Sequence, residues 1–163
     1  MNKIYKILIC LGVAIIQLTL MPIFKINGVF PNLILIGVIV LAINDFEENA
    51  FLLAGFGGLV LDMGSSLPFG FNTALFLAAT FCIRLLVVKY LPEINFMIVA
   101  AVVFVFSCFF GLIFNLISGQ LTIVAILINS IYSVVLGLIF FWQLHRVQKI
   151  NQSIQMGKNS EYI

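Results

Sequence analysis

The sequence predicts an all-α, polytopic membrane protein: a compact bundle of about six transmembrane helices with both termini in the cytoplasm. Two observations support this fold class. Hydrophobic residues make up 63% of the 163 residues and charged residues only 9%, too few to build a soluble surface, where roughly 25% are charged. Apolar runs also recur along the chain, separated by short polar or Gly/Pro turns. We expect residues 1–142 to form the bundle and residues 143–163 a short polar cytoplasmic tail, disordered or loosely bound to the surface.

The first two spans are expected at residues 7–21 and 31–43. Lys3 and Lys6 precede the first span, and no small-x-small cleavage site follows it, so we interpret it as a retained helix. Its single polar group, Gln17, is expected to be satisfied by a neighbouring helix. Pro31 and Asn32 open the second span, where a proline fits the first helical turn because its missing N–H is not needed there. An acidic turn at residues 44–49 follows.

The third span, residues 50–62, carries small residues four apart at Ala50, Ala54 and Gly58, followed by Asp62. Residues four apart lie on one helix face, and in lipid small residues let another helix approach closely. The face is therefore predicted to pack against a neighbour.

A Gly/Pro-rich turn at residues 63–72 ends this helix and contains Pro68, Gly70 and Asn72. Proline fixes the backbone and glycine permits angles closed to other residues, so a rigid outer turn is expected. Asp62 has two roles open to it. It can accept hydrogen bonds from the N–H groups of Gly64, Ser65 and Ser66, or it can contact a partner.

The remaining spans are predicted at residues 73–88, 96–117 and 123–142. Arg84 in the fourth span is expected to reach the inner interface rather than pair with Asp62, since antiparallel helices place the two at opposite faces. Trp142 suits a membrane–water interface. Two further polar or small-residue stripes occur at intervals of four: Ser107, Gly111 and Asn115, and then Ala125, Asn129, Ser133 and Gly137.

The distribution of positive charge predicts the orientation. With six spans, one side of the membrane holds both termini and the turns near residues 45–48 and 89–93. That side carries Lys3, Lys6, Lys89, Arg146, Lys149 and Lys158, whereas the other side carries only Lys25 outside the membrane. The positive-inside rule therefore places both termini in the cytoplasm and the turn after Asp62 outside.

The sequence offers no catalytic, metal or cofactor signature. Cys10, Cys82 and Cys108 lie singly in apolar segments without CxxC spacing, and His145 has no nearby partner ligand. Ser65 and Ser66 lack a histidine on their side of the membrane. The basic residues are scattered, which gives no indication of nucleic-acid binding. We therefore expect a non-enzymatic protein without cofactor or metal.

A family resemblance is carried by the hairpin. The run Gly55-Phe-Gly57-Gly58-Leu-Val-Leu-Asp62, followed by Gly64-Ser65 and Leu67-Pro68-Phe69-Gly70, resembles the signature of MreD, the rod shape-determining membrane protein family. The Phe30-Pro31-Asn32-Leu33 opening is similar too, although an aspartate is usual where Asn32 stands. The positions singled out for helix packing or partner contact are Ala54, Gly55, Gly58, Asp62, Pro68, Gly70 and Asn72, with Pro31 and Asn32 at the start of the second span.

The resemblance implies a multi-pass component of the bacterial plasma membrane that belongs to the cell-elongation machinery. Its expected partners are the lipid bilayer and an MreC-like single-span protein, and indirectly the MreB filament and RodA with its class B penicillin-binding protein. In size and six-helix form the chain also resembles substrate-binding subunits of energy-coupling-factor vitamin transporters, which gives an alternative. A vitamin binder would need an outward pocket lined by aromatic and polar groups.

Overall fold

The computed structural model describes residues 3–19, 23, 31–44, 46–65, 67–90, 95–118 and 123–160. The remaining residues, which include the last two of the predicted first span and Ser66 of the predicted turn, lie outside the description. Within these ranges the chain is all-helical, without strands. The elements are α1 (Lys3–Thr19), α2 (Leu33–Ile43), α3 (Glu47–Leu52), a π-helical turn η2 (Leu53–Gly57), α4 (Gly58–Gly64), α5 (Phe71–Tyr90), α6 (Phe96–Ser118) and α7 (Ile123–Ser160). Because α3, η2 and α4 are continuous, they form one helix.

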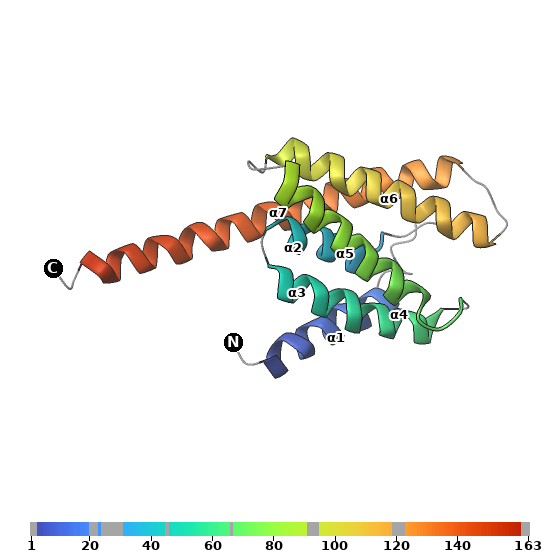
Figure 1. Cartoon of the computed structure of the whole chain (residues 1–163), viewed down its shortest axis with the longest axis horizontal. Helices are drawn as coiled ribbons and strands as arrows, with labels where there is room; N and C mark the ends of the chain where they lie inside the picture. Colours follow the sequence, from blue (N-terminus) through green and yellow to red (C-terminus); the bar gives the residue numbers. More distant parts are fainter. Residues whose placement is uncertain are drawn as a thin grey trace.

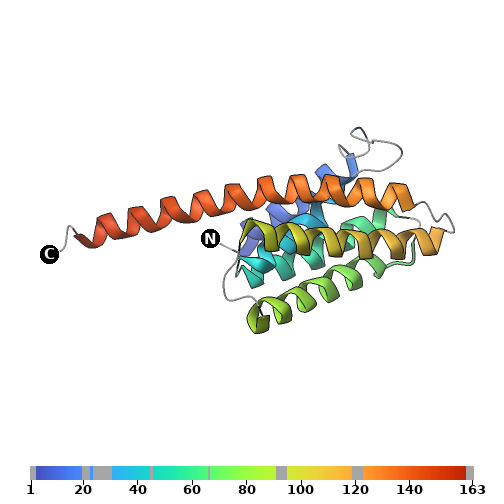
Figure 2. The same cartoon turned by 90° about the horizontal axis from the view of Figure 1, so that it is seen from above.

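The helices run back and forth along one common direction (Figures 1 and 2). The start of α1, the α2–α3 turn and the start of α6 lie at one end of the bundle. The α4–α5 hairpin lies at the opposite end (Figure 1). This alternation brings residues far apart in sequence into two separate polar groups, one at each end.

Two helices are long and apolar enough to cross a membrane: Phe96–Ile117 and Ile123–Val147. Their 22 and 25 residues match a hydrocarbon layer of about 30 Å at about 1.5 Å per residue. Shorter apolar helices are Tyr5–Thr19, Leu33–Ile43 and Phe71–Val87. Many large apolar side chains on α5, α6 and α7 point outward, among them Phe81, Val105, Phe109, Leu116 and Ile131. Such a surface is typical of contact with lipid or protein rather than water.

The short helix α2 forms the centre of the bundle. Nine of its residues are buried: Ile34, Leu35, Ile36, Gly37, Val38, Ile39, Val40, Ala42 and Ile43. A helix that is apolar on all sides is stable only when surrounded, and its neighbours here include α1, α3, α5, α6 and α7. The expected start at Pro31 was wrong, because Asn32 is the N-cap and Pro31 precedes it.

Two other predicted boundaries were wrong. The helix containing the small-residue face begins at Glu47 rather than Ala50, because Glu47 and Glu48 occupy its first turn, where the helix dipole favours acids. At the other end of the chain, α7 continues to Ser160 instead of ending at Trp142, and it projects beyond the bundle (Figures 1 and 2). The segment is polar but contains no proline, so no residue in it removes a backbone donor from the helix.

Candidate functional site

Asp62 joins the two helices of the hairpin. Its side chain, 4% exposed, accepts three hydrogen bonds from the start of α5. Oδ1 accepts from the Asn72 backbone N–H at 2.8 Å, and Oδ2 accepts from the Thr73 N–H at 3.2 Å and the Thr73 hydroxyl at 2.7 Å. The first N–H groups of a helix lack partners within it, so the carboxylate acts as a cap supplied by the preceding helix. The observed donors lie on the far side of the turn, at Asn72 and Thr73, instead of at the predicted Gly64 and Ser65, and the third predicted donor, Ser66, lies outside the described residues.

The turn itself is shaped by two of the predicted residues. Gly70 has a φ of +89°, a conformation that side chains disfavour, and its carbonyl accepts from Ala74 N–H at 2.9 Å. The carbonyl of Pro68 accepts from Phe71 N–H at 3.1 Å, while the Asn72 side chain donates to the Ser65 hydroxyl at 3.5 Å. The structure thus gathers Asp62, Asn72, Pro68 and Gly70 into one closed turn.

The small-residue face is buried inside the bundle. Ala50 and Ala54 are fully buried, and Gly58 lies against the backbone of α5. A Cβ added at Gly58 would meet the Thr73 Cα at 2.6 Å, which is too close for any side chain. Gly55 differs from these residues, because no atom lies within 4 Å of where its Cβ would be. Gly55 therefore does not pack against another helix of the bundle, and of its two expected roles, helix packing and partner contact, only partner contact stays a prediction.

The start of α2 is fixed by side-chain caps. Asn32 accepts a hydrogen bond from the Leu35 N–H at 3.1 Å, the ordinary role of an N-cap, which an amide performs as well as a carboxylate. Gln17, buried in α1, donates to the Pro31 carbonyl at 3.2 Å and accepts from the Leu33 N–H at 2.7 Å. The prediction that a neighbouring helix satisfies Gln17 is confirmed, and the contact ties α1 to α2.

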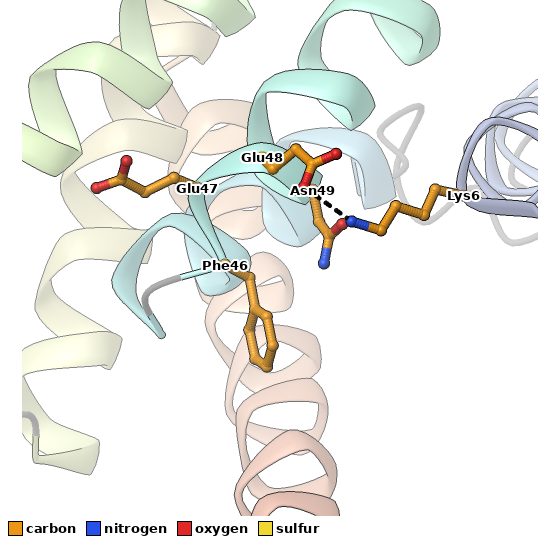
Figure 3. A pocket seen from close by; sticks show the side chains of 5 residues that line it. All are labelled: Lys6, Phe46, Glu47, Glu48 and Asn49. Carbon is orange, nitrogen blue, oxygen red and sulfur yellow. Dashed lines mark hydrogen bonds and ion pairs between the residues drawn. The ribbon is translucent and has the colours of Figure 1, made fainter. Parts of the chain in front are cut away.

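At the opposite end, two ion pairs surround the first turn of α3. Glu48 pairs with Lys6 of α1 at 3.0 Å, and Glu47 pairs with Arg84 of α5. Arg84 also donates to the Ala42 carbonyl near the end of α2 at 3.2 Å. Figure 3 shows Glu47 pointing away from Lys6 while Glu48 lies on the Lys6 side. Sequence reasoning missed this cluster. Three of its residues, Lys6, Glu47 and Glu48, line an open pocket of about 370 Å³ together with Phe46 and Asn49.

Arg84 is more enclosed than expected. Its side chain is only 13% exposed, so it is held within the cluster instead of extending alone to the interface. It makes no contact with Asp62 in the described hydrogen bonds and ion pairs, in agreement with the predicted separation of the two residues. The partners of each ion pair lie far apart in sequence, and therefore no local pattern could have revealed them.

A second polar contact joins α6 and α7. The Cys108 thiol donates to the Ser130 hydroxyl at 3.1 Å, and Gly111 and Gly137 allow close contact with Ile126 and Val103 respectively. Across the described residues, no three His, Cys, Asp or Glu side chains come together as a metal site. These contacts hold α6 and α7 together.

Comparisons of the chain with protein families, with curated proteins and with solved structures found no match. The geometry itself defines what the hairpin does. Both oxygens of Asp62 accept hydrogen bonds from the same chain, so the carboxylate anchors the start of α5 to the end of α4.

Proposed function

We propose that this chain is a non-enzymatic, multi-pass protein of the bacterial plasma membrane that works in the cell-elongation machinery, as MreD family members do. One observation carries the proposal. The residues that resemble the MreD signature also form the α4–α5 hairpin. Gly58 contacts α5, Asp62 caps the N-terminus of α5, and Gly70 has the positive φ of the turn.

The proposed arrangement in the membrane has six spans. The long helices α6 and α7 cross it fully, and the shorter helices α1, α2, α3–α4 and α5 cross as one packed unit around the buried α2. The ion-pair cluster is then cytoplasmic and the hairpin external, since the lysine-rich ends lie with the cluster.

The proposed role is to scaffold. An MreC-like single-span protein is the direct partner, and the MreB filament and RodA with its class B penicillin-binding protein are engaged through it. A turn already ordered by internal hydrogen bonds loses little entropy when a partner binds, which suits a docking surface.

Complementation tests the proposal. A rod-shaped bacterium depleted of its own MreD is expected to regain rod shape when this chain is expressed, and the tagged chain should co-purify with MreC from mild detergent. The variant Pro68→Ala/Gly70→Val should lose both effects at equal membrane levels, because valine at a φ of +89° strains the turn. Phe81→Leu, on the exposed side of α5, is the matched control and should retain both. The vitamin-transporter alternative would be favoured if the complemented cells stayed round and the tagged chain co-purified with paired ATPases instead of MreC.

A further inference from the structure

One side of α7 carries an outward apolar stripe that ends in a cation. The stripe consists of Ile131, Val135, Ile139 and Trp142, and Arg146 follows it. These residues are three or four positions apart, so they lie on the same side of the helix. The four apolar side chains are between 50% and 59% exposed, and Arg146 is exposed as well. The stripe therefore lies on the outside of the bundle.

A neighbouring aromatic contact sets the depth of Arg146. Phe141, 3% exposed, packs edge-to-face on Phe96 of α6 with ring centroids 5.2 Å apart. Phe96 begins the apolar span of α6, so the adjacent Trp142 lies near the edge of the hydrocarbon. Both views show α7 continuing beyond this end of the bundle (Figures 1 and 2). Arg146 lies about 6 Å further along the helix than Trp142, which is the depth of lipid headgroups.

Arg146 differs from the other cations whose side chains the structure describes. Lys6 and Arg84 pair with glutamates, whereas Arg146 lies over the ring of Trp142, with Cζ 5.7 Å from the ring centroid. This is the geometry of a cation–π contact. The helix α7 itself contains no Asp or Glu. Among the described residues, the positive charge of Arg146 is therefore not balanced by a carboxylate.

The length of the stripe matches one leaflet of a bilayer. Ile131 and Trp142 are about 16 Å apart along the helix, and half of the hydrocarbon layer is about 15 Å thick. A phospholipid with an anionic headgroup matches both parts of the surface, because its acyl chain fits the stripe and its phosphate fits the cation. A second copy of the chain matches less well, since a two-fold pair along this stripe would bring two Arg146 side chains together.

We propose that this surface binds an anionic phospholipid, with an acyl chain along Ile131, Val135 and Ile139 and the phosphate beside Arg146 and Trp142. The assignment to the inner leaflet rests on the orientation given under the proposed function. The lipid would hold α7 at a fixed depth at the point where the helix leaves the bundle.

Intrinsic fluorescence tests the site, because Trp142 is the only tryptophan of the chain. The full-length chain is reconstituted in phosphatidylcholine vesicles that contain a small fraction of lipid with brominated acyl chains, which quench tryptophan on contact. The brominated lipid is either phosphatidylglycerol, which is anionic, or phosphatidylcholine. Brominated phosphatidylglycerol should quench with an apparent affinity about fivefold higher, the effect expected of one cation beside an anionic headgroup.

Two variants locate the charge responsible. Arg146→Gln should remove the preference for phosphatidylglycerol but keep quenching by phosphatidylcholine, because the apolar stripe still contacts lipid. Lys6→Gln is the matched control: it changes the net charge equally at the same end of the bundle, but at a residue paired with Glu48, and it should retain the preference.

Four results would overturn the site. Equal quenching by the two lipids in the unaltered chain would mean that the headgroup is not recognised. A preference that survives in Arg146→Gln, or that is lost equally in both variants, would assign it to the charge of the whole protein. Lack of quenching by either lipid would mean that protein, such as a second copy, covers the stripe.

The lipid site and the proposed function fail separately, because the vesicles contain no other protein. If complementation succeeds and the lipid preference is absent, the site is rejected and the role in cell elongation stands. If the preference is present and complementation fails, the site stands and that role is rejected.

Discussion

Asp62 shows how a single acid can organise an apolar chain. A buried ionised carboxylate is costly in a membrane unless hydrogen bonds compensate it, and here three donors do so. Because an ionised aspartate has only hydrogen-bond acceptors, it can bind all three donors without bringing two donors together. The sequence indicated a capping role, but the donors lie beyond the turn, ten and eleven residues away, where spacing along one helix gives no information.

We expect Asp62→Asn to lower the free energy of unfolding in mild detergent by about 1.5–3 kcal/mol, because the amide turns an NH₂ group toward an N–H donor. Thr73→Val removes only the hydroxyl bond and should cost about 1 kcal/mol. Denaturant unfolding of the two purified variants gives the comparison. Equal losses would mean that the backbone bonds to Asp62 contribute little.

At the scale of elements, two glycines of one helix have different roles. Gly58→Ala places a Cβ 2.6 Å from the Thr73 Cα, so α4 and α5 must separate; we expect a cost of about 1–3 kcal/mol. Gly55→Ala meets open space and should be neutral or stabilise by up to about 1 kcal/mol through helix propensity. Thermal unfolding in detergent measures both. Similar melting temperatures for the two variants would contradict the assigned faces.

The two ion pairs are also unequal. Arg84→Met removes a mostly buried guanidinium that binds both Glu47 and the Ala42 carbonyl, and we expect a loss of about 1–3 kcal/mol. Lys6→Met breaks a pair whose Glu48 is largely exposed, which should cost at most about 1 kcal/mol. Unfolding in high salt provides the control. Because salt screens exposed charges, it should reduce the loss in unfolding free energy caused by Lys6→Met but not the loss caused by Arg84→Met.

Helix positions could be predicted from hydropathy, whereas their boundaries and contacts could not. Glu47 lies in the first turn of α3, although a polar run such as residues 44–49 is typical of a loop. The polar segment after Trp142 continues the helix α7, and it contains no proline. The π-turn at Leu53–Gly57 has no sequence signature of its own. The small-residue face identified Gly58 correctly as a packing position, but Gly55 lies outside the period of four and points away.

Among the described residues, two polar networks lie at opposite ends of the bundle, and Cys108 and Ser130 form a further polar contact between α6 and α7. The hairpin network around Asp62 lies at one end, and the Lys6–Glu48 and Arg84–Glu47 pairs lie at the other (Figures 1 and 3). Between them, α2 is enclosed and the outward side chains are apolar. This separation matches a molecule whose ends face water on two sides of a membrane.

The proposed orientation predicts which end is accessible from outside. After Cys10, Cys82 and Cys108 are replaced by alanine, a cysteine at Phe69 in the hairpin should react with an impermeant thiol reagent on intact protoplasts. A cysteine at Met97, at the opposite end of the bundle, should react only after lysis. Both positions are well exposed, at 68% and 83%, so burial does not limit either reaction. The reverse pattern would invert the topology, and labelling of both on intact cells would contradict a membrane-spanning bundle, because no barrier would then separate the two ends.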